Sequence, residues 1–360
     1  MRHYLLILLI CMTFVLTSCS FIPSSNVNEI NIIEGAGFDL EEQNQLRATV
    51  TFPIFRANET TEFDIVSEKG ETLKNIREKI DKQIRHRMMS GQLRLVIFSL
   101  DLAKKGIFSI LDTFNRDPAI GNLLQMAVVE GETFDLLSLK EYEQENISLY
   151  LHDLLLQNSE TGPLPKSDFS TYLYQYFEEG QDPFLPMLKN DKGTIKISGI
   201  ALFDDDKFVV KIPWKYAFIL KTLMGSYRKG MHQFNFKGEH IAIDNINSKI
   251  KYKIKMKKGN PEFNIHLGMN ARILEYTGPK PILLPKHIKE ISKRIENQIE
   301  KDQKDLISIF QKNNVDPLGF GSKLEAHKRD FDYKKWKKQY PHVKVKIKVD
   351  LDILHTGIVE

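Results

Sequence analysis

The sequence predicts an α+β protein of mixed α/β character, built from several domains in which helices cover mixed sheets. In the N-terminal half, segments typical of strands alternate with segments typical of helices, an order that favours a helix-covered sheet. In the C-terminal half, long stretches of alternating polar and apolar residues enclose one long amphipathic helix. This second pattern indicates an amphipathic antiparallel sheet packed against the helix.

The N-terminal half contains one clear amphipathic helix, expected over residues 71–89. Apolar side chains recur there at helical spacing, at Leu73, Ile76, Ile80 and Ile84. The other expected elements of this half are strands over 29–40, 46–55, 92–99 and 123–131, and helices over 100–117, 140–157 and 167–179.

The C-terminal half begins with an expected hairpin over 195–213, whose turn holds Asp204, Asp205 and Asp206. Acidic residues at a hairpin tip are usually turn formers, and binding of a divalent cation is the alternative that we leave open. The later expected elements are a helix over 215–229, two strands within 248–276 around a turn at 259–261, a helix over 285–313 and a strand over 343–354.

Lysines alternate with apolar residues in two of these expected strands, so they would share one basic sheet face. A lysine ladder is usually a solvated face that opposes edge-to-edge pairing. The functional alternative is contact with anionic lipid or cell-wall polymer. The lysines expected on this face include Lys251, Lys253, Lys255, Lys344, Lys346 and Lys348.

Charge divides the chain into an acidic and a basic half. Residues 19–190 carry 16 Lys and Arg against 27 Asp and Glu, whereas residues 191–360 carry 34 against 20. A change of sign on this scale, within a stretch rich in Pro, Gly and polar residues, predicts a domain boundary. The expected domains are an acidic α/β domain over 29–190 and a basic α+β domain over 194–360, the latter divisible into 194–235 and 236–360.

The N-terminus has the composition of an export signal. The apolar run over residues 4–16 is shorter than the roughly 20 residues that a membrane-spanning helix needs. The tetrad Leu-Thr-Ser-Cys at 16–19 resembles the bacterial lipobox, in which the cysteine takes a diacylglycerol and becomes the new N-terminus. We therefore expect a cleaved lipoprotein signal peptide over 1–18, an N-acyl, S-diacylglycerol Cys19, and a lipid tether over 19–28. An ordinary signal with a cysteine at its cleavage site is the alternative.

Familiar catalytic and cofactor motifs do not occur in the sequence, which lacks G-x-S-x-G, H-E-x-x-H, the P-loop and paired-cysteine zinc patterns. The two cysteines are Cys11, inside the expected signal, and Cys19, which lipid would occupy. We therefore expect no catalytic residues, no cofactor and no metal ion. Export also argues against a nucleic-acid partner.

Several stretches resemble the Ger(x)C family, the C-subunit lipoproteins of nutrient germinant receptors in spore-forming bacteria. The two most specific are SGQLRLVIFSLDLAKKGIFSILDTFNRDPAI at 90–120 and VDPLGFGSKL at 315–324. The resemblance extends from Cys19 to the C-terminus. Its other stretches are EI and GAGFD within 29–39, DPFLP at 182–186 and the closing YPHVKVKIKVDLDILHTGIV at 340–359.

The resemblance implies a multi-domain α/β lipoprotein on the outer face of the spore inner membrane. It implies assembly with two membrane-embedded subunits, of the A and B types, into a receptor for small nutrients. It further implies a non-catalytic scaffold or coupling role, and carries over only Cys19 as a functional position. Two alternatives stay open: an exported solute-binding lipoprotein, which would need two similar lobes, and a cell-wall-acting enzyme, which would need paired acids in a cleft.

Overall fold

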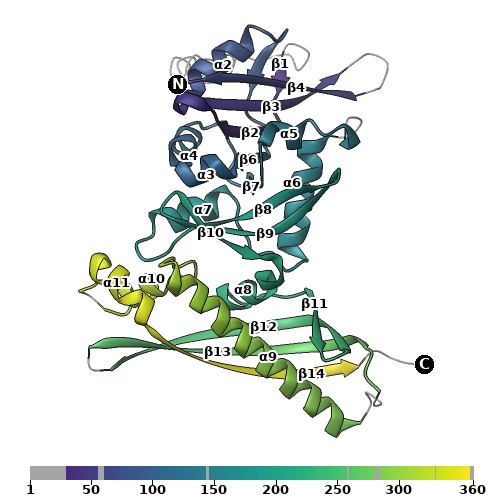
Figure 1. The fold of residues 1–360 in the computed structure, drawn as a ribbon, viewed down its shortest axis with the longest axis vertical. Coiled ribbons are helices and arrows are strands. Elements are labelled where there is room, and N and C mark those ends of the chain that lie inside the picture. Colours follow the sequence, from purple (N-terminus) through teal and green to yellow (C-terminus); the bar gives the residue numbers. More distant parts are fainter. Residues whose placement is uncertain are drawn as a thin grey trace, which may run out of the picture.

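The computed structural model describes residues 30–55, 61–142, 146–257, 259–279, 284–328 and 330–356. Figure 1 shows an elongated molecule, with one sheet towards the N-terminal end of the long axis and a sheet of long strands at the other end. Sheets and helices alternate along the chain, and the sheets contain both parallel and antiparallel pairs. The mixed α+β class predicted from the sequence is confirmed.

An eight-stranded mixed sheet forms the N-terminal part of the molecule. Its spatial order is β10 (Lys207–Pro213), β9 (Thr194–Asp204), β8 (Phe184–Asp191), β7 (Gln125–Val129), β6 (Leu95–Ser99), β2 (Gly35–Leu40), β3 (Leu46–Phe55) and β4 (Thr61–Gly70). The central strands β8, β7, β6 and β2 are parallel neighbours, and antiparallel strands flank them on both sides. The central strands are continuous apolar runs because both faces of a parallel sheet are covered.

Helices cover both faces of this sheet, as Figure 1 shows, and each face has its own apolar core. The helices that contribute to one core are α2 (Leu73–Asp81), α3 (Leu100–Lys105), α4 (Phe108–Asn115) and α7 (Phe169–Phe177). In this part of the molecule, the helices that contribute to the other core are α5 (Thr133–Leu137), α6 (Ile147–Glu160) and α8 (Ala217–Met224). Short 3₁₀ helices are η2 (Glu42–Asn44), η3 (Lys140–Tyr142), η4 (Trp214–Tyr216) and η5 (Tyr340–His342).

The prediction of a helix over 71–89 is wrong beyond Asp81, where α2 ends. Helix α2 begins after Thr72, whose hydroxyl accepts a hydrogen bond from the first turn, and it buries Ile76 and Ile80 as expected. The chain then leaves the helix and forms β5 (Arg87–Met89), which pairs in parallel with β1 (Ile30–Ile32). Pairing with this distant strand outweighs the local helical periodicity.

The helix expected over 100–117 consists of two helices, α3 and α4. Gly106 separates them with φ +126°, a conformation that side chains disfavour and that does not continue a helix. Strand β4 and helix α5 were not expected from the sequence. Strand β4 adds to the predicted sheet, and helix α5 adds to the helices that cover it.

A four-stranded sheet forms the C-terminal part, and the long helix α9 (Pro285–Lys312) crosses one of its faces (Figure 1). The strands, in spatial order, are β11 (Met231–Phe236), β12 (Glu239–Lys257), β13 (Asn260–Tyr276) and β14 (Lys344–Thr356). The expected antiparallel arrangement holds for β11, β12 and β13, but β14 pairs with β13 in parallel. The crossover through α9 returns the chain to the same end of the sheet, so the next strand runs in the direction of β13.

The boundary expected at 190–194 lies in the turn between β8 and β9, and hydrogen bonding within the eight-stranded sheet continues through it. One apolar core also extends from Leu151 on α6, through Leu220 on α8, to Phe263 on β13 and Ile295 on α9. The division of the chain into domains at this position stays a prediction.

Candidate functional site

Two stretches that are far apart in the sequence, 182–186 and 315–324, meet where the two sheets adjoin. The amide of Asp316 donates to Oδ2 of Asp182 (2.6 Å), and the amide of Asp182 donates to the carbonyl of Asp316 (3.0 Å). Both aspartates are buried. We call Asp182, Asp316 and their neighbours Asp204 and Lys337 the acid–lysine junction.

Lys337, on helix α11 (Tyr333–Gln339), places its ammonium group between two carboxylates. Its Nζ lies 3.3 Å from Oδ2 of Asp182 and 2.5 Å from Oδ1 of Asp204, and it donates to the carbonyl of Asn314 (3.2 Å). Burial alone would lower the pKa of Lys337, but the charges of Asp182 and Asp204 outweigh it and raise that pKa. A charged Lys337 therefore connects α11 to the end of β9 and the start of β8.

The two buried acids of the junction have raised pKa values. Burial raises the pKa of Asp182 to about 6, against the attraction of Lys337. Burial also raises the pKa of Asp316 to about 7, although the amides of Phe320 and Gly321 stabilise its charged form. The charge of the junction therefore changes between weakly acidic and neutral pH.

Two glycines allow the main chains to touch beside these acids. Gly180 has φ +81°, and a Cβ there would lie 2.6 Å from both the carbonyl carbon of Gly321 and the amide nitrogen of Ser322. The amide of Ser322 donates to the carbonyl of Gly180 (3.2 Å). Gly319, with φ +62°, precedes helix α10 (Phe320–Glu325), so the segment that starts at Asp316 is a tight turn.

The acidic turn at 204–206 links the junction to the helical layer of the N-terminal sheet. Oδ2 of Asp206 accepts a hydrogen bond from the amide of Phe108 (3.0 Å), and its carbonyl accepts one from Ile107 (3.2 Å). Asp205 has φ +54°, as turn-forming aspartates can. Within the part of the chain that the structure describes, no group of three or more His, Cys, Asp or Glu residues is arranged to hold a metal ion.

The lysines expected on one sheet face are exposed there. The register places Lys251 opposite His266 and His266 opposite Lys348, and the next row holds Lys253, Asn264 and Lys346. Two of the six are paired, Lys346 with Glu262 (2.8 Å) and Lys348 with Asp350 (2.8 Å). Among the described residues, no ion-pair partner lies within 4.0 Å of Lys251, Lys253, Lys255 or Lys344.

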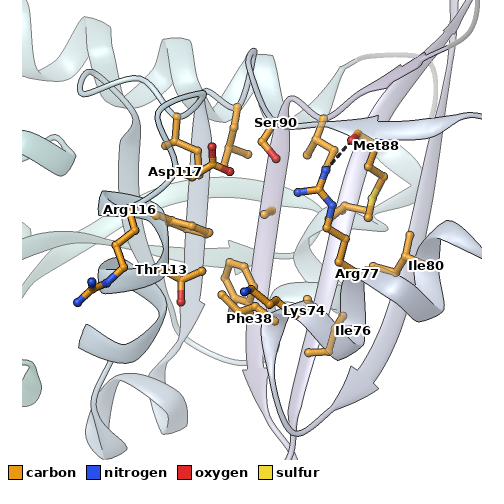
Figure 2. Close-up of a pocket in the computed structure, with 18 of the residues that line it drawn as sticks. Phe38, Lys74, Ile76, Arg77, Ile80, Met88, Ser90, Thr113, Arg116 and Asp117 are labelled. Carbon is orange, nitrogen blue, oxygen red and sulfur yellow. Dashed lines mark hydrogen bonds between the residues drawn. The ribbon is translucent and has the colours of Figure 1, made fainter.

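A pocket of about 570 Å³ opens on the N-terminal sheet between α2 and α4, and we call it the α2–α4 pocket. Among the polar side chains that Figure 2 labels, Lys74 and Arg77 come from α2, Thr113 from α4, and Arg116 and Asp117 from the segment that follows α4. Phe38 on β2 forms part of its apolar floor. The size and the apolar lining with few polar groups are typical of a small-molecule site.

Comparison with known proteins identifies the family. Residues 23–190 match the family described as "Spore germination protein N-terminal domain", and residues 198–357 match "Spore germination B3/ GerAC like, C-terminal". The chain belongs to the Ger(x)C family of spore germination proteins. The resemblance stated from the sequence is therefore confirmed.

Relatives align along nearly the whole Ger(x)C chain. "Spore germination protein GerQC" of Bacillus cereus is 29% identical over 357 residues, which cover 98% of this chain and 99% of the relative. "Putative spore germination protein YfkR" of Bacillus subtilis (strain 168) is 20% identical over 376 residues, covering 98% and 95%. The crystal structure of the GerBC protein shares the fold, with a TM-score of 0.60 and 16% identity over 89% of this chain and 97% of that one.

The membrane anchor expected for this Ger(x)C protein lies outside the described residues. Cys19, the signal peptide and the tether fall in this N-terminal region, so lipidation stays a prediction. From residue 30 to residue 356, excluding the short gaps, no helix is both long and apolar enough to cross a membrane.

Sequence reasoning selected 182–186 and 315–324 as family stretches but did not indicate that they meet. It also missed Lys337, because this residue is one of four lysines in the run YKKWKK and nothing local distinguishes it. A weak signal was available, since both stretches contain Asp-Pro, which begins a tight turn at Asp316 and directly precedes β8 at Asp182. The α2–α4 pocket had no signal in the sequence.

Proposed function

We propose that this protein is the C-type subunit of a spore nutrient germinant receptor, with a non-catalytic role as a rigid scaffold or coupling element. The observation that carries the proposal is the match of both family regions, in order, along one chain. The acid–lysine junction supports the rigid body, because main-chain hydrogen bonds and a buried ion pair connect Asp182 to Asp316 and Lys337. A body connected in this way transmits a displacement from one end to the other.

The proposed partners are the two membrane-embedded subunits of the receptor, and the proposed location is the outer face of the spore inner membrane. In this proposal residues 1–18 are removed, lipid on Cys19 holds the protein at the membrane, and 19–28 form the tether. Support comes from the apolar run over 4–16, which is short and ends in a lipobox-like tetrad.

Contact between the basic sheet face and anionic lipid is a second part of the proposal. Exposed lysines without a carboxylate partner, such as Lys251, Lys253 and Lys255, attract an anionic surface by about 1 kcal/mol each. Changing these three to Glu should remove salt-sensitive sedimentation with phosphatidylglycerol vesicles. The matched control changes three exposed lysines of α9, and equal losses in both variants would contradict this contact. The α9 lysines are Lys286, Lys289 and Lys301.

The two alternative functions find less support. A cell-wall-acting enzyme needs acids that a substrate can reach, whereas Asp182 and Asp316 are each only 3% exposed and contact main-chain amides. A solute-binding lipoprotein needs two similar lobes. Here one part contains an eight-stranded sheet and the other a four-stranded sheet crossed by α9.

The deciding experiment replaces Cys19 by Ala and follows both spore-membrane fractionation and nutrient-triggered germination. We expect the variant to leave the inner-membrane fraction and the nutrient response to fail. The matched control is Cys11→Ala, which changes the other cysteine of the chain and should alter neither readout. Normal germination despite lost localisation would overturn the receptor role, and unchanged localisation would overturn the anchor.

A further inference from the structure

The α2–α4 pocket has walls that are fixed without a ligand. Nη2 of Arg77 donates to the carbonyl of Met88 (2.7 Å), as the dashed line in Figure 2 shows, and the amide of Met88 donates to Oδ1 of Asp81 (3.3 Å). Thr72 caps the other end of α2. These bonds join α2 to β5, so contacts within the protein hold this wall of the pocket, and a ligand that enters orders few of its side chains.

The floor of the pocket exists because small residues face larger ones across two strands. In the register of β2 and β3, Ala36 lies opposite Val50 and Phe38 lies opposite Ala48. All four line the pocket and are buried at its base. The two alanines leave space that larger side chains would fill, and this space is apolar.

The charges at the pocket differ from those elsewhere on α2. Outside the pocket, Lys82 pairs with Glu78 (2.8 Å) and Lys79 donates to a carbonyl oxygen. The pocket-lining Lys74 and Arg77 lie three residues apart on one helical face, and neither has a carboxylate within 4.0 Å in the described ranges.

Two other charged side chains line the pocket on the side of α4. Arg116 pairs with Asp112 (3.0 Å) and points away from the other labelled side chains in Figure 2. Asp117 accepts a hydrogen bond from the amide of Ala119 (3.0 Å). The cations that remain available are therefore both on α2, above an apolar floor.

We propose that the α2–α4 pocket binds a small amphipathic anion. The apolar body lies against Phe38, Ile76 and the two alanines, and the single anionic group lies at Lys74 and the free donors of Arg77. An apolar body removes water from the floor, and a charged head group supplies the carboxylate-like partner that the described residues do not give these two cations. This site is separate from the junction and from the basic sheet face, and it does not depend on the proposed receptor role.

The test uses anilinonaphthalene sulfonate, an apolar anion whose fluorescence rises in apolar surroundings, with decanoate as competitor. We expect saturable one-to-one binding to the purified protein and displacement by decanoate. Lys74→Glu should weaken both ligands at least tenfold, and Lys82→Glu, the same change at the C-terminal end of α2 and outside the pocket, should alter binding less than twofold. Decanol, which has the same tail without the charge, should compete at least tenfold more weakly than decanoate.

A second variant tests the floor independently of charge. Ala48→Ile places a larger side chain in the space, so binding should fall at least tenfold. Because residue 48 lies in a strand, which suits a β-branched side chain, the melting temperature should stay within a few degrees. If this variant fails to fold, the comparison of Lys74→Glu with Lys82→Glu still decides. The proposal is overturned if the probe does not bind, if those two charge variants bind alike, or if decanol competes as well as decanoate.

Discussion

The amide of Asp316 donates a hydrogen bond of 2.6 Å to the carboxylate of Asp182, although 134 residues separate the two in the chain. The amide of Asp182 donates in return to the carbonyl of Asp316. A proline follows each aspartate and restricts the main chain there, before β8 at Asp182 and in a turn at Asp316. This reciprocal contact connects the two sequence regions that define the family.

Stability should depend on pH through these two acids. In the unfolded chain an aspartate titrates near pH 4, whereas in the folded protein the pKa is about 6 for Asp182 and about 7 for Asp316. Between these values the folded state holds more protons than the unfolded state. Their contribution to the free energy of unfolding is therefore present at low pH and lost as pH rises from about 4 to 7. For each acid, the free energy of unfolding falls by about 1.4 kcal/mol for every unit by which the folded pKa exceeds the unfolded pKa.

The variant Asp316→Asn isolates this contribution, because the amide is neutral at every pH and its oxygen can still accept a hydrogen bond. Half-buried His232, whose pKa burial lowers to about 4, titrates in the opposite sense, but it does so equally in both proteins. Denaturant unfolding at several pH values should show the variant gaining stability relative to wild type from pH 4.5 to 7.5. A constant difference would contradict the buried acid, and exposed Asp352→Asn should give no such trend over this range.

Removing the cation of the junction should destabilise the fold. In Lys337→Met, the carboxylate of Asp182 stays buried and loses its positive partner, which should cost about 3 kcal/mol. Urea unfolding near pH 7 measures this loss. The matched control is Lys338→Met on the same helix, whose exposed side chain should contribute less than about 0.5 kcal/mol. Similar losses in the two variants would show that Lys337 is a surface charge.

The acidic turn should contribute through Asp206. Replacing it by Ala leaves the amide of Phe108 at the start of α4 without its acceptor, at a cost of about 1 kcal/mol. Asp206→Asn keeps an acceptor oxygen and should lose less, and the difference between the two variants in urea unfolding measures the hydrogen bond. Equal losses would mean that the charge, and not the bond, is what stabilises the turn.

The sequence predicts the C-terminal sheet well because its alternating pattern is long. The strands expected within 248–276 are present as parts of β12 and β13. The direction of β14 could not be predicted in the same way. The pattern around Lys346 indicates which face of β14 is buried but not that β14 runs parallel to β13. Strand β4 was missed because TEFDIVSEKG is rich in charged residues, as sheet edges often are.

The junction was less predictable than the fold, because its chemistry arises from burial and not from spacing. In the sequence, Asp182 and Asp316 are only aspartates followed by proline, and packing between distant segments is what raises their pKa values. For α2 the sequence indicated only the apolar stripe. That Lys74 lines a pocket depends on β2, β3 and α4, which lie elsewhere in the chain.

Close approach of the main chains at Gly180 gives the sharpest test of the junction. Gly180→Ala introduces a Cβ at φ +81° and within 2.6 Å of main-chain atoms of Gly321 and Ser322. Gly259 has φ +82° and nothing within 4 Å of the same added atom, so Gly259→Ala carries the conformational strain alone.

The control should therefore lose about 1 kcal/mol, the strain of a left-handed residue. Gly180→Ala should lose at least about 3 kcal/mol, because the two segments must also separate. Denaturant unfolding of the two variants measures the difference. Equal losses of unfolding free energy would mean that the main chains at Gly180 and Gly321 do not touch. The reciprocal contact between Asp182 and Asp316 would then lack the support that this close approach gives it.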